Sequence, residues 1–227
     1  ELIRVSDNGR GISESDLEIC FLRYTTSKIR SADDLAHIQT NGFRGEALSS
    51  ISAVSVVDIF SKTESQDSAY CLKVRQGLME SKEPTARANG TTFEVRKLFY
   101  NTPVRAKFLA GIQTETNKVT DILTRLSLIH PHIGFEFHHD TKEILKTRQG
   151  KPEIRIAEVL GPKVAKFLIP VSYESENMAI SGYIGTQEIS KGRRSQQFLY
   201  LDNRPIWNSG LLKVIENGYQ TFHPGRY

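Results

Sequence analysis

The chain has 227 residues, of which 38% are hydrophobic, so it can form one large domain or two modest ones around a sizeable core. Its 30 basic and 26 acidic side chains give a net charge of +4, which permits contact with nucleic acid but falls short of the excess typical of a dedicated binder. Because no apolar run reaches the roughly 18 residues of a membrane span and no signal peptide opens the chain, we expect no membrane contact.

The first half of the chain predicts a strand at 2–5, followed by a helix that Ser13 caps and that continues toward Tyr24. The polar stretch 25–41 is predicted to be a mobile segment, and a helix is expected to open near Gly45 and run through Ile51. Further on, the pattern predicts strands at 54–62, 69–75 and 91–97, a helix at 103–109 and a longer helix that stops near Pro131.

In the second half, a hairpin is expected from the strands 133–139 and 143–147, and the Gly- and Pro-bearing segment 148–152 is the best domain boundary. Beyond it we expect a helix at 154–160, strands at 169–173, 178–185 and 197–201, a turn at 202–203, and a final helix capped by Asn208 or Ser209. Strands and helices do not alternate as regular βαβ units, which predicts an α+β fold with helices layered on a mixed sheet, in two domains at 1–150 and 151–227.

Two further features concern the cysteines and the first residues of the chain. Cys20 and Cys71 lie in apolar patterns without metal-ligand spacing, so we expect buried, reduced thiols in a cytoplasmic protein. Glu1 is not a methionine, and the first strand leads at once into a candidate ligand loop. Since a domain rarely begins one step before its ligand loop, we expect an internal fragment whose site is completed by residues upstream.

Asp7, Gly9 and Gly11 form the first candidate site. An ionised carboxylate only accepts hydrogen bonds, so Asp7 at the bottom of a pocket suits the exocyclic amine of adenine. The two glycines let the backbone approach a flat base without a Cβ in the way. An Asp-Asn-Gly turn is also a strong hairpin signal. A capped helix follows here instead of a returning strand, which favours the ligand loop.

A second glycine-bearing loop, at residues 42–48, leads into a helix. The start of a helix offers unpaired backbone N–H groups to phosphates. No Lys-Ser/Thr pair follows its second glycine, so it is not a Walker loop. A loop whose glycines only permit tight packing remains the alternative. The candidate phosphate-binding residues here are Gly42, Phe43, Arg44, Gly45, Glu46, Ala47 and Leu48.

Smaller signals accompany these loops. Thr26, Ser27 and Lys28 can contact phosphate oxygens or a hydrated metal, although a solvated loop has the same composition. Thr91 can hydrogen-bond on the base side of the pocket, although threonine is also a good strand residue. The basic residues Lys191, Arg193 and Arg194 are a modest candidate for contact with a DNA backbone. His138 and His139 point to opposite faces of a strand and are interpreted as surface residues of a hairpin, with zinc binding as a minor alternative.

The whole chain resembles the MutL family of DNA mismatch repair proteins, within the ATPase superfamily of gyrase B, Hsp90 and the histidine kinases. The segments that carry the resemblance are 7–12, 25–29, 42–51, 90–95, 98–105 and 201–205. The Asp-Asn-Gly motif is widely shared, whereas Gly-Phe-Arg-Gly-Glu-Ala-Leu at 42–48 with Thr-Ser-Lys upstream is specific to MutL-like proteins. The resemblance implies a Bergerat-type ATPase fold followed by an incomplete second domain similar to ribosomal protein S5 domain 2.

The resemblance also implies roles. Asp7 and Thr91 would bind adenine, Thr26 to Lys28 would belong to a lid, and the segment from Arg44 to Leu48 would hold the triphosphate of ATP with Mg²⁺. The family's catalytic Glu and magnesium-binding Asn would lie upstream of residue 1, and a lysine for the terminal phosphate would lie beyond Tyr227. None of the chain's own residues is therefore expected to be catalytic, and the fragment should hydrolyse little ATP.

Together these observations predict the ATP-binding region of a bacterial MutL-like protein, an ATPase when complete. It would order a lid, dimerise as a homodimer and act with DNA and the mismatch-recognition protein MutS, in the cytoplasm and at the nucleoid during repair. The alternatives are a gyrase-like topoisomerase subunit, or a DNA-binding scaffold that kept the fold without the chemistry.

Overall fold

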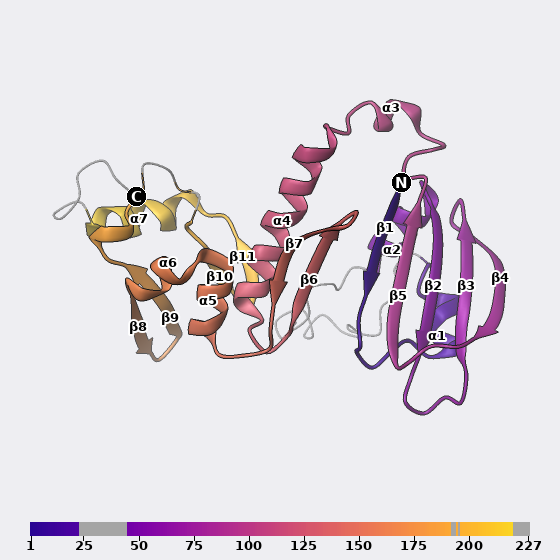
Figure 1. The fold of residues 1–227 in the computed structure, drawn as a ribbon, viewed down its shortest axis with the longest axis horizontal. Coiled ribbons are helices and arrows are strands. Elements are labelled where there is room, and N and C mark those ends of the chain that lie inside the picture. Colours follow the sequence, from indigo (N-terminus) through magenta and orange to yellow (C-terminus); the bar gives the residue numbers. More distant parts are fainter. Residues whose placement is uncertain (23–44, 192–193, 195, 220–227) are drawn as a thin grey trace. The chain divides into compact units, whose positions relative to one another are not determined.

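The computed structural model describes residues 1–22, 45–191, 194 and 196–219 (Figure 1). The chain divides into two compact units, Glu1–Leu109 and Ala110–Tyr227, which we describe one at a time. This division comes earlier than the boundary expected at 150, because the long helix and the hairpin that precede residue 150 both pack against the helix that follows it. The assignment of functional domains at 1–150 and 151–227 stays a prediction.

The first unit is built on a five-stranded sheet in the order β1-β5-β2-β3-β4, in which every pairing is antiparallel. A mixed sheet was expected, so the structure differs in this detail. Three short helices accompany the sheet among the residues described in this unit, and Figure 1 shows α1 and α2 on one of the sheet's faces. The strands are β1 (Leu2–Ser6), β2 (Val56–Lys62), β3 (Ala69–Arg75), β4 (Leu78–Thr85) and β5 (Gly90–Arg96), and the helices are α1 (Glu14–Ile19), α2 (Ala47–Ala53) and α3 (Pro103–Ala106).

A hydrophobic core lies between the sheet and the helices α1 and α2. Side chains alternate along β2, so that Val57 and Ile59 are buried while Asp58 faces the other way. The cluster joins the buried residues of β2 and β3 to those of α1, with Leu48 of α2 packed against it. Its buried members are Leu17, Phe21, Val57, Ile59, Leu72 and Val74.

Helix α1 begins as predicted, because the Ser13 side chain accepts a hydrogen bond from the Asp16 N–H at 3.2 Å. It ends at Ile19, whereas Tyr24 of the expected stripe lies outside the described residues. The predicted helix at 103–109 is shorter than expected and ends at Ala106.

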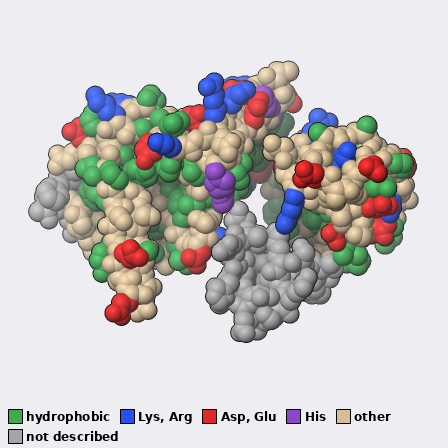
Figure 2. Space-filling model, turned by 90° about the horizontal axis from the view of Figure 1, so that it is seen from below, with side chains coloured by type: hydrophobic (Ala, Val, Ile, Leu, Met, Phe, Trp, Pro, Cys, Tyr) green, Lys and Arg blue, Asp and Glu red, His purple; other side chains and the backbone are tan. Residues whose placement is uncertain are grey.

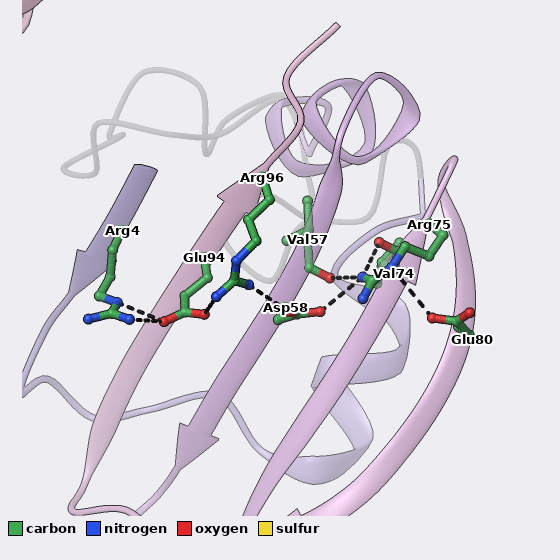
Figure 3. Close-up of polar contacts among 8 residues, drawn as sticks. All are labelled: Arg4, Val57, Asp58, Val74, Arg75, Glu80, Glu94 and Arg96. Atoms are coloured by element: carbon green, nitrogen blue, oxygen red, sulfur yellow. Dashed lines mark hydrogen bonds and ion pairs between the residues drawn. The ribbon is translucent and has the colours of Figure 1, made fainter. Parts of the chain in front are cut away.

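The opposite face of the sheet carries a row of alternating charges, which we call the charged ladder (Figure 3). Arg96 joins Asp58 at 2.8 Å and also bonds Glu94, while Arg4 bonds Glu94 at 2.6 Å. Further along, one guanidinium on β3 reaches a carboxylate on each neighbouring strand, at 2.9 Å and 3.5 Å. The ladder therefore crosses all five strands, and its members are Arg4, Glu94, Arg96, Asp58, Arg75 and Glu80.

In its described part, the second unit contains three two-stranded antiparallel hairpins and their helices. The predicted hairpin forms and turns through Asp140 at φ 52°, and Asn208 caps the last helix by accepting a hydrogen bond from Leu211 at 3.0 Å. The strands are β6 (Phe135–His139), β7 (Lys142–Thr147), β8 (Leu168–Ser175), β9 (Met178–Gly185), β10 (Leu199–Leu201) and β11 (Arg204–Ile206). The helices are α4 (Ile112–Ile129), α5 (Pro152–Leu160), α6 (Pro162–Lys166), the 3-10 helix η2 (Gln187–Ile189) and α7 (Ser209–Tyr219).

Arg155 on α5 is the largest fully buried side chain described, with no exposed surface. Its guanidinium donates to Ile133 O at 2.6 Å and to Arg148 O at 2.7 Å, and the Phe135 ring lies 5.7 Å away. It also donates to carbonyls at the end of α4 and in the turn that follows, those of Ser127, His130 and Pro131. One side chain thus joins the end of α4, the β6–β7 hairpin and α5.

Hydrophobic side chains gather over the second unit in the view of Figure 2. On the β8–β9 hairpin, one face pairs Ile169 with Ile184 and Tyr173 with Ile180, and these four side chains are 39–57% exposed. Among the described helices, none is long and apolar enough to cross a membrane.

Candidate functional site

Asp7 follows β1 directly and is held by the start of β5. Its N–H donates to Thr91 O at 2.8 Å, and its Oδ1 accepts from Gly9 N at 2.8 Å and from Thr91 N at 3.2 Å. Asp7 is exposed, and no hydrogen bond from a described residue reaches its Oδ2. The result is a carboxylate fixed through one oxygen, with the other oxygen available to a ligand that donates a hydrogen bond.

Two glycines beside Asp7 meet neighbouring backbone too closely for any side chain. A Cβ on Gly11, at φ +75°, would lie 2.1 Å from Lys62 O, and one on Gly90, at φ +117°, would lie 2.2 Å from Asp7 O. Glycine is therefore required at both positions by space and by conformation. Gly9 differs, because a Cβ there would meet only the Asp7 carboxylate, at 2.9 Å.

A pair of buried hydroxyls lies behind the carboxylate. Ser61 at the end of β2 is fully buried, and Thr91 is 4% exposed. Ser61 Oγ is 3.1 Å from Thr91 Oγ1, and it accepts from Ile12 N at 2.7 Å and donates to Gly90 O at 3.2 Å. Three segments of the candidate site therefore meet at one hydroxyl.

Arg87, in the loop before β5, contacts both the end of β2 and the residue that follows β1. Its guanidinium donates to Phe60 O at 2.5 Å and to Asp7 O at 3.2 Å. Sequence reasoning missed both Arg87 and Ser61. Neither lies in a recognisable motif, and only the pairing of β1, β2 and β5 brings them to Asp7.

The second predicted loop is described in part. Gly45 has φ +62°, Glu46 occupies the N-cap position without a side-chain cap bond, α2 begins at Ala47, and Leu48 packs on the core. The predicted helix start is therefore present. Six of the predicted nucleotide-binding residues lie outside the described residues: Thr26, Ser27, Lys28, Gly42, Phe43 and Arg44.

The predicted DNA-contacting residues belong to the second unit. Arg194 forms an ion pair with Glu216 at 2.6 Å, so its guanidinium has an internal partner. Lys191 is exposed, and Arg193 lies outside the described residues. DNA contact through this run stays a prediction.

Among the described residues, neither the histidines nor the cysteines supply an obvious reactive group. His138, Glu136 and Glu143 form an exposed group with ligand atoms within 4.8 Å of one another. Lys146 already pairs with both of these carboxylates, at 3.4 Å and 3.2 Å, so a cation is present there. Both cysteines are free; Cys71 is buried as predicted, whereas Cys20 is only partly buried. Burial still raises the pKa of Cys20 to about 11, which keeps this thiol protonated at neutral pH.

Comparison with known proteins relates these features to one family. Residues 156–227 match the family model described as "DNA mismatch repair protein, C-terminal domain". The DNA mismatch repair proteins MutL of Halothermothrix orenii and Listeria monocytogenes are 39% and 42% identical to the chain, over 100% and 99% of its length. The chain belongs to the MutL family of DNA mismatch repair proteins. It spans 36% and 38% of the length of these two MutL relatives.

Solved structures agree on the MutL fold. A crystal structure of the N-terminal domain of a DNA repair protein matches with a TM-score of 0.80 and 30% identity, covering 99% of this chain and 71% of that one. The Aquifex aeolicus MutL ATPase domain complexed with ADP matches with a TM-score of 0.72 and 25% identity, covering 95% and 75%. The predicted family and the α+β class are thus confirmed, and the gyrase-like and scaffold alternatives are not favoured.

Proposed function

We propose that this chain is the ATP-binding region of a MutL-type mismatch repair protein and that Asp7 receives the 6-amino group of adenine. The observation that carries the proposal is the Asp7 carboxylate, held at Oδ1 by two backbone N–H groups and open at Oδ2. An acceptor-only group in a fixed position selects a ligand that donates, as the amine of adenine does. The ADP bound to the related Aquifex aeolicus domain supports a nucleotide as the ligand.

The triphosphate would lie along the segment from Gly42 to Leu48, at the start of α2, with Thr26, Ser27 and Lys28 in a lid over it. The hydroxyls of Thr26 and Ser27 would contact the phosphate oxygens or a hydrated Mg²⁺ bound to them. The metal would supply charge neutralisation at the phosphates. This chain's own part is to bind and orient the nucleotide.

In the intact protein, the bound ATP would be hydrolysed. Order–disorder switching by a γ-phosphate is a known physical device, and here it would order the lid and bring two N-terminal regions together as a homodimer. Nucleotide state would thereby be communicated to MutS and DNA in a cytoplasmic repair complex that forms at the nucleoid.

The test is isothermal titration of the intact protein with ATP and excess Mg²⁺, comparing the parent with Asp7→Asn. The substitution preserves shape but offers the adenine amine a half-donor group, so affinity should fall about tenfold to a hundredfold, equivalent to roughly 1.5–3 kcal/mol. Thermal unfolding without nucleotide should be nearly unchanged, because Asp7 is exposed.

Asp67→Asn is the matched control, since Asp67 is an exposed aspartate in the β2–β3 loop of the same unit. It should bind ATP as the parent does. If the parent gives no ATP-dependent heat, the proposed function is wrong. If Asp7→Asn binds ATP as tightly as the parent, Asp7 is only a turn residue.

A further inference from the structure

Arg87 makes three hydrogen bonds at the edge of the candidate site, and all three go to backbone carbonyl groups. Its guanidinium donates to Phe60 O at 2.5 Å, to Asp7 O at 3.2 Å and to Ala88 O at 3.0 Å. Phe60 lies on β2 and Asp7 follows β1, whereas β5 lies between these two strands in the sheet. One half-buried side chain therefore reaches both neighbours of β5 from the loop that precedes β5.

The bond to the Asp7 carbonyl fixes the peptide group that leads away from Asp7. The peptide group on the other side of Asp7 is fixed as well, because the Asp7 N–H donates to Thr91 O at 2.8 Å. The Asp7 carbonyl also lies against the start of β5, where a Cβ on Gly90 would be 2.2 Å from its oxygen. The backbone of Asp7 is thus held from both directions, and Arg87 is the side chain that holds its outgoing half.

This fixation of the backbone extends to the carboxylate of the same residue. Gly9 N, two residues further on, donates to Asp7 Oδ1 at 2.8 Å, so the direction of this N–H depends on the peptide group between Asp7 and Asn8. The position of Oδ1 determines where the open Oδ2 points, because both oxygens belong to one rigid carboxylate. A guanidinium suits this task, since its planar set of N–H donors can meet three carbonyl groups at once.

We infer that Arg87 is a positioning residue that acts on nucleotide affinity through Asp7, by holding the peptide group after Asp7 and so the direction of the open carboxylate oxygen. The inference rests on the proposed function, because it assumes that this carboxylate receives the base of ATP. It adds to the binding site a residue that lies outside the glycine-bearing loops and need not touch the ligand.

The experiment is a double-mutant cycle of Arg87→Met and Asp7→Asn in the intact protein, with ATP and inorganic tripolyphosphate as ligands. Tripolyphosphate has no base, and Arg87→Met keeps an unbranched side chain while removing every donor. In Arg87→Met, ATP affinity should fall about tenfold, the scale expected when hydrogen bonds from one charged group are lost. Tripolyphosphate affinity should change less than about twofold, because this ligand makes no contact with Asp7.

The second half of the cycle tests whether Arg87 acts through Asp7. In the Asp7→Asn background, Arg87→Met should lower ATP affinity by less than about twofold further, because the carboxylate that Arg87 orients is already an amide. Arg87→Lys should keep part of the ATP affinity, since an ammonium still donates but lacks the planar fork.

Arg75→Met is the matched control. Arg75 is another partly exposed arginine of the same sheet, and its guanidinium also donates to backbone carbonyls, those of Val57 and Val74 at 3.1 Å and 3.0 Å. Because it lies outside the candidate site, Arg75→Met should leave both affinities as in the parent.

Equal losses of ATP and tripolyphosphate affinity in Arg87→Met, or losses that add up in the double variant, would assign Arg87 a purely structural role and overturn the inference. A loss of ATP affinity of the same size in Arg75→Met would do the same. If Arg87→Met does not fold, the cycle is run with Arg87→Lys, whose loss must also vanish in the Asp7→Asn background. A parent that binds no ATP, or an Asp7→Asn variant that binds it as tightly as the parent, would instead remove the proposed function, and this inference with it.

Discussion

The two units use the same chemical group, a guanidinium, in opposite surroundings. In the first unit Arg96 lies on the sheet surface, 38% exposed, between the carboxylates of Asp58 and Glu94. In the second, Arg155 has no exposed surface and donates mainly to backbone carbonyls. Surface ion pairs contribute little because water competes for both charges. A buried cation with many acceptors has no such alternative, so its removal leaves the acceptors unpaired.

The largest effect is expected from Arg155→Met. The substitution fills similar volume but removes all five carbonyl partners at once, and a loss of about 3–5 kcal/mol in the free energy of unfolding should follow. Arg155→Lys should recover only part of it, because an ammonium lacks the planar fork that reaches several carbonyls. Urea unfolding, with hydrogen exchange used to assign the loss to residues 110–219, provides the measurement.

Arg148→Met is the control for this experiment. Arg148 is exposed, and its guanidinium makes no hydrogen bond or ion pair with a described residue, although its carbonyl accepts from Arg155. Stability should stay within about 0.5 kcal/mol of the parent. A comparable loss in both variants would show that the buried guanidinium has no special role in the second unit.

The first unit should depend in the same way on its apolar core. Leu72 on β3 is 1% exposed within the hydrophobic cluster, and Leu72→Ala should cost about 2–4 kcal/mol through lost burial and a cavity. Leu78→Ala, at a leucine that is 73% exposed on β4, should cost far less. Equal midpoints of urea unfolding for the two variants would contradict the assigned core.

The smallest effect is expected in the charged ladder, from Glu94→Gln. Burial by itself would raise the pKa of Glu94, but hydrogen bonds from Arg96 and Arg4 outweigh burial and lower it below the usual value. A lowered carboxyl pKa stabilises the fold above the ordinary carboxyl range, and this stabilisation is lost as pH falls through the lowered value. At neutral pH the variant should lose about 0.5–1 kcal/mol, a small figure because the two arginine partners, 58% and 38% exposed, remain in contact with solvent that screens their charge.

Unfolding midpoints measured between pH 7 and pH 3 test this expectation. The difference between parent and Glu94→Gln should shrink as the solution becomes acidic, and Glu64→Gln, at an exposed glutamate of the β2–β3 loop, should follow the parent throughout. A difference that grows in acid would contradict the lowered pKa of Glu94.

The sequence predicted most elements because their periodicity is local. It missed β4, whose side chains show no clean alternation and include Pro84, since this strand exists through its backbone pairing with β3. It missed β11, which is only three residues long and forms by pairing after the turn at Asp202 and Asn203. Such strands depend on a pairing partner that sequence patterns do not identify.

The candidate site shows the same limit. Asp7, Gly11 and Gly90 lie in sequence motifs, and their close backbone contacts agree with a need for glycine. Ser61 reads as an ordinary polar residue of a strand, and Arg155 as a charge on the outer face of a helix. Their roles come from residues that are distant along the chain, so only the tertiary structure identifies them.

The arrangement of the charged ladder also determines the electrostatic potential that it produces at a distance from the protein. Its three guanidinium groups and three carboxylates cancel, and they alternate at spacings shorter than the Debye length of about 8 Å in physiological salt. The potential of this row therefore decays within a short layer of solvent. A polyanion approaching by diffusion would therefore experience no long-range electrostatic attraction to these six residues. The net charge of +4 acts through other surfaces of the chain.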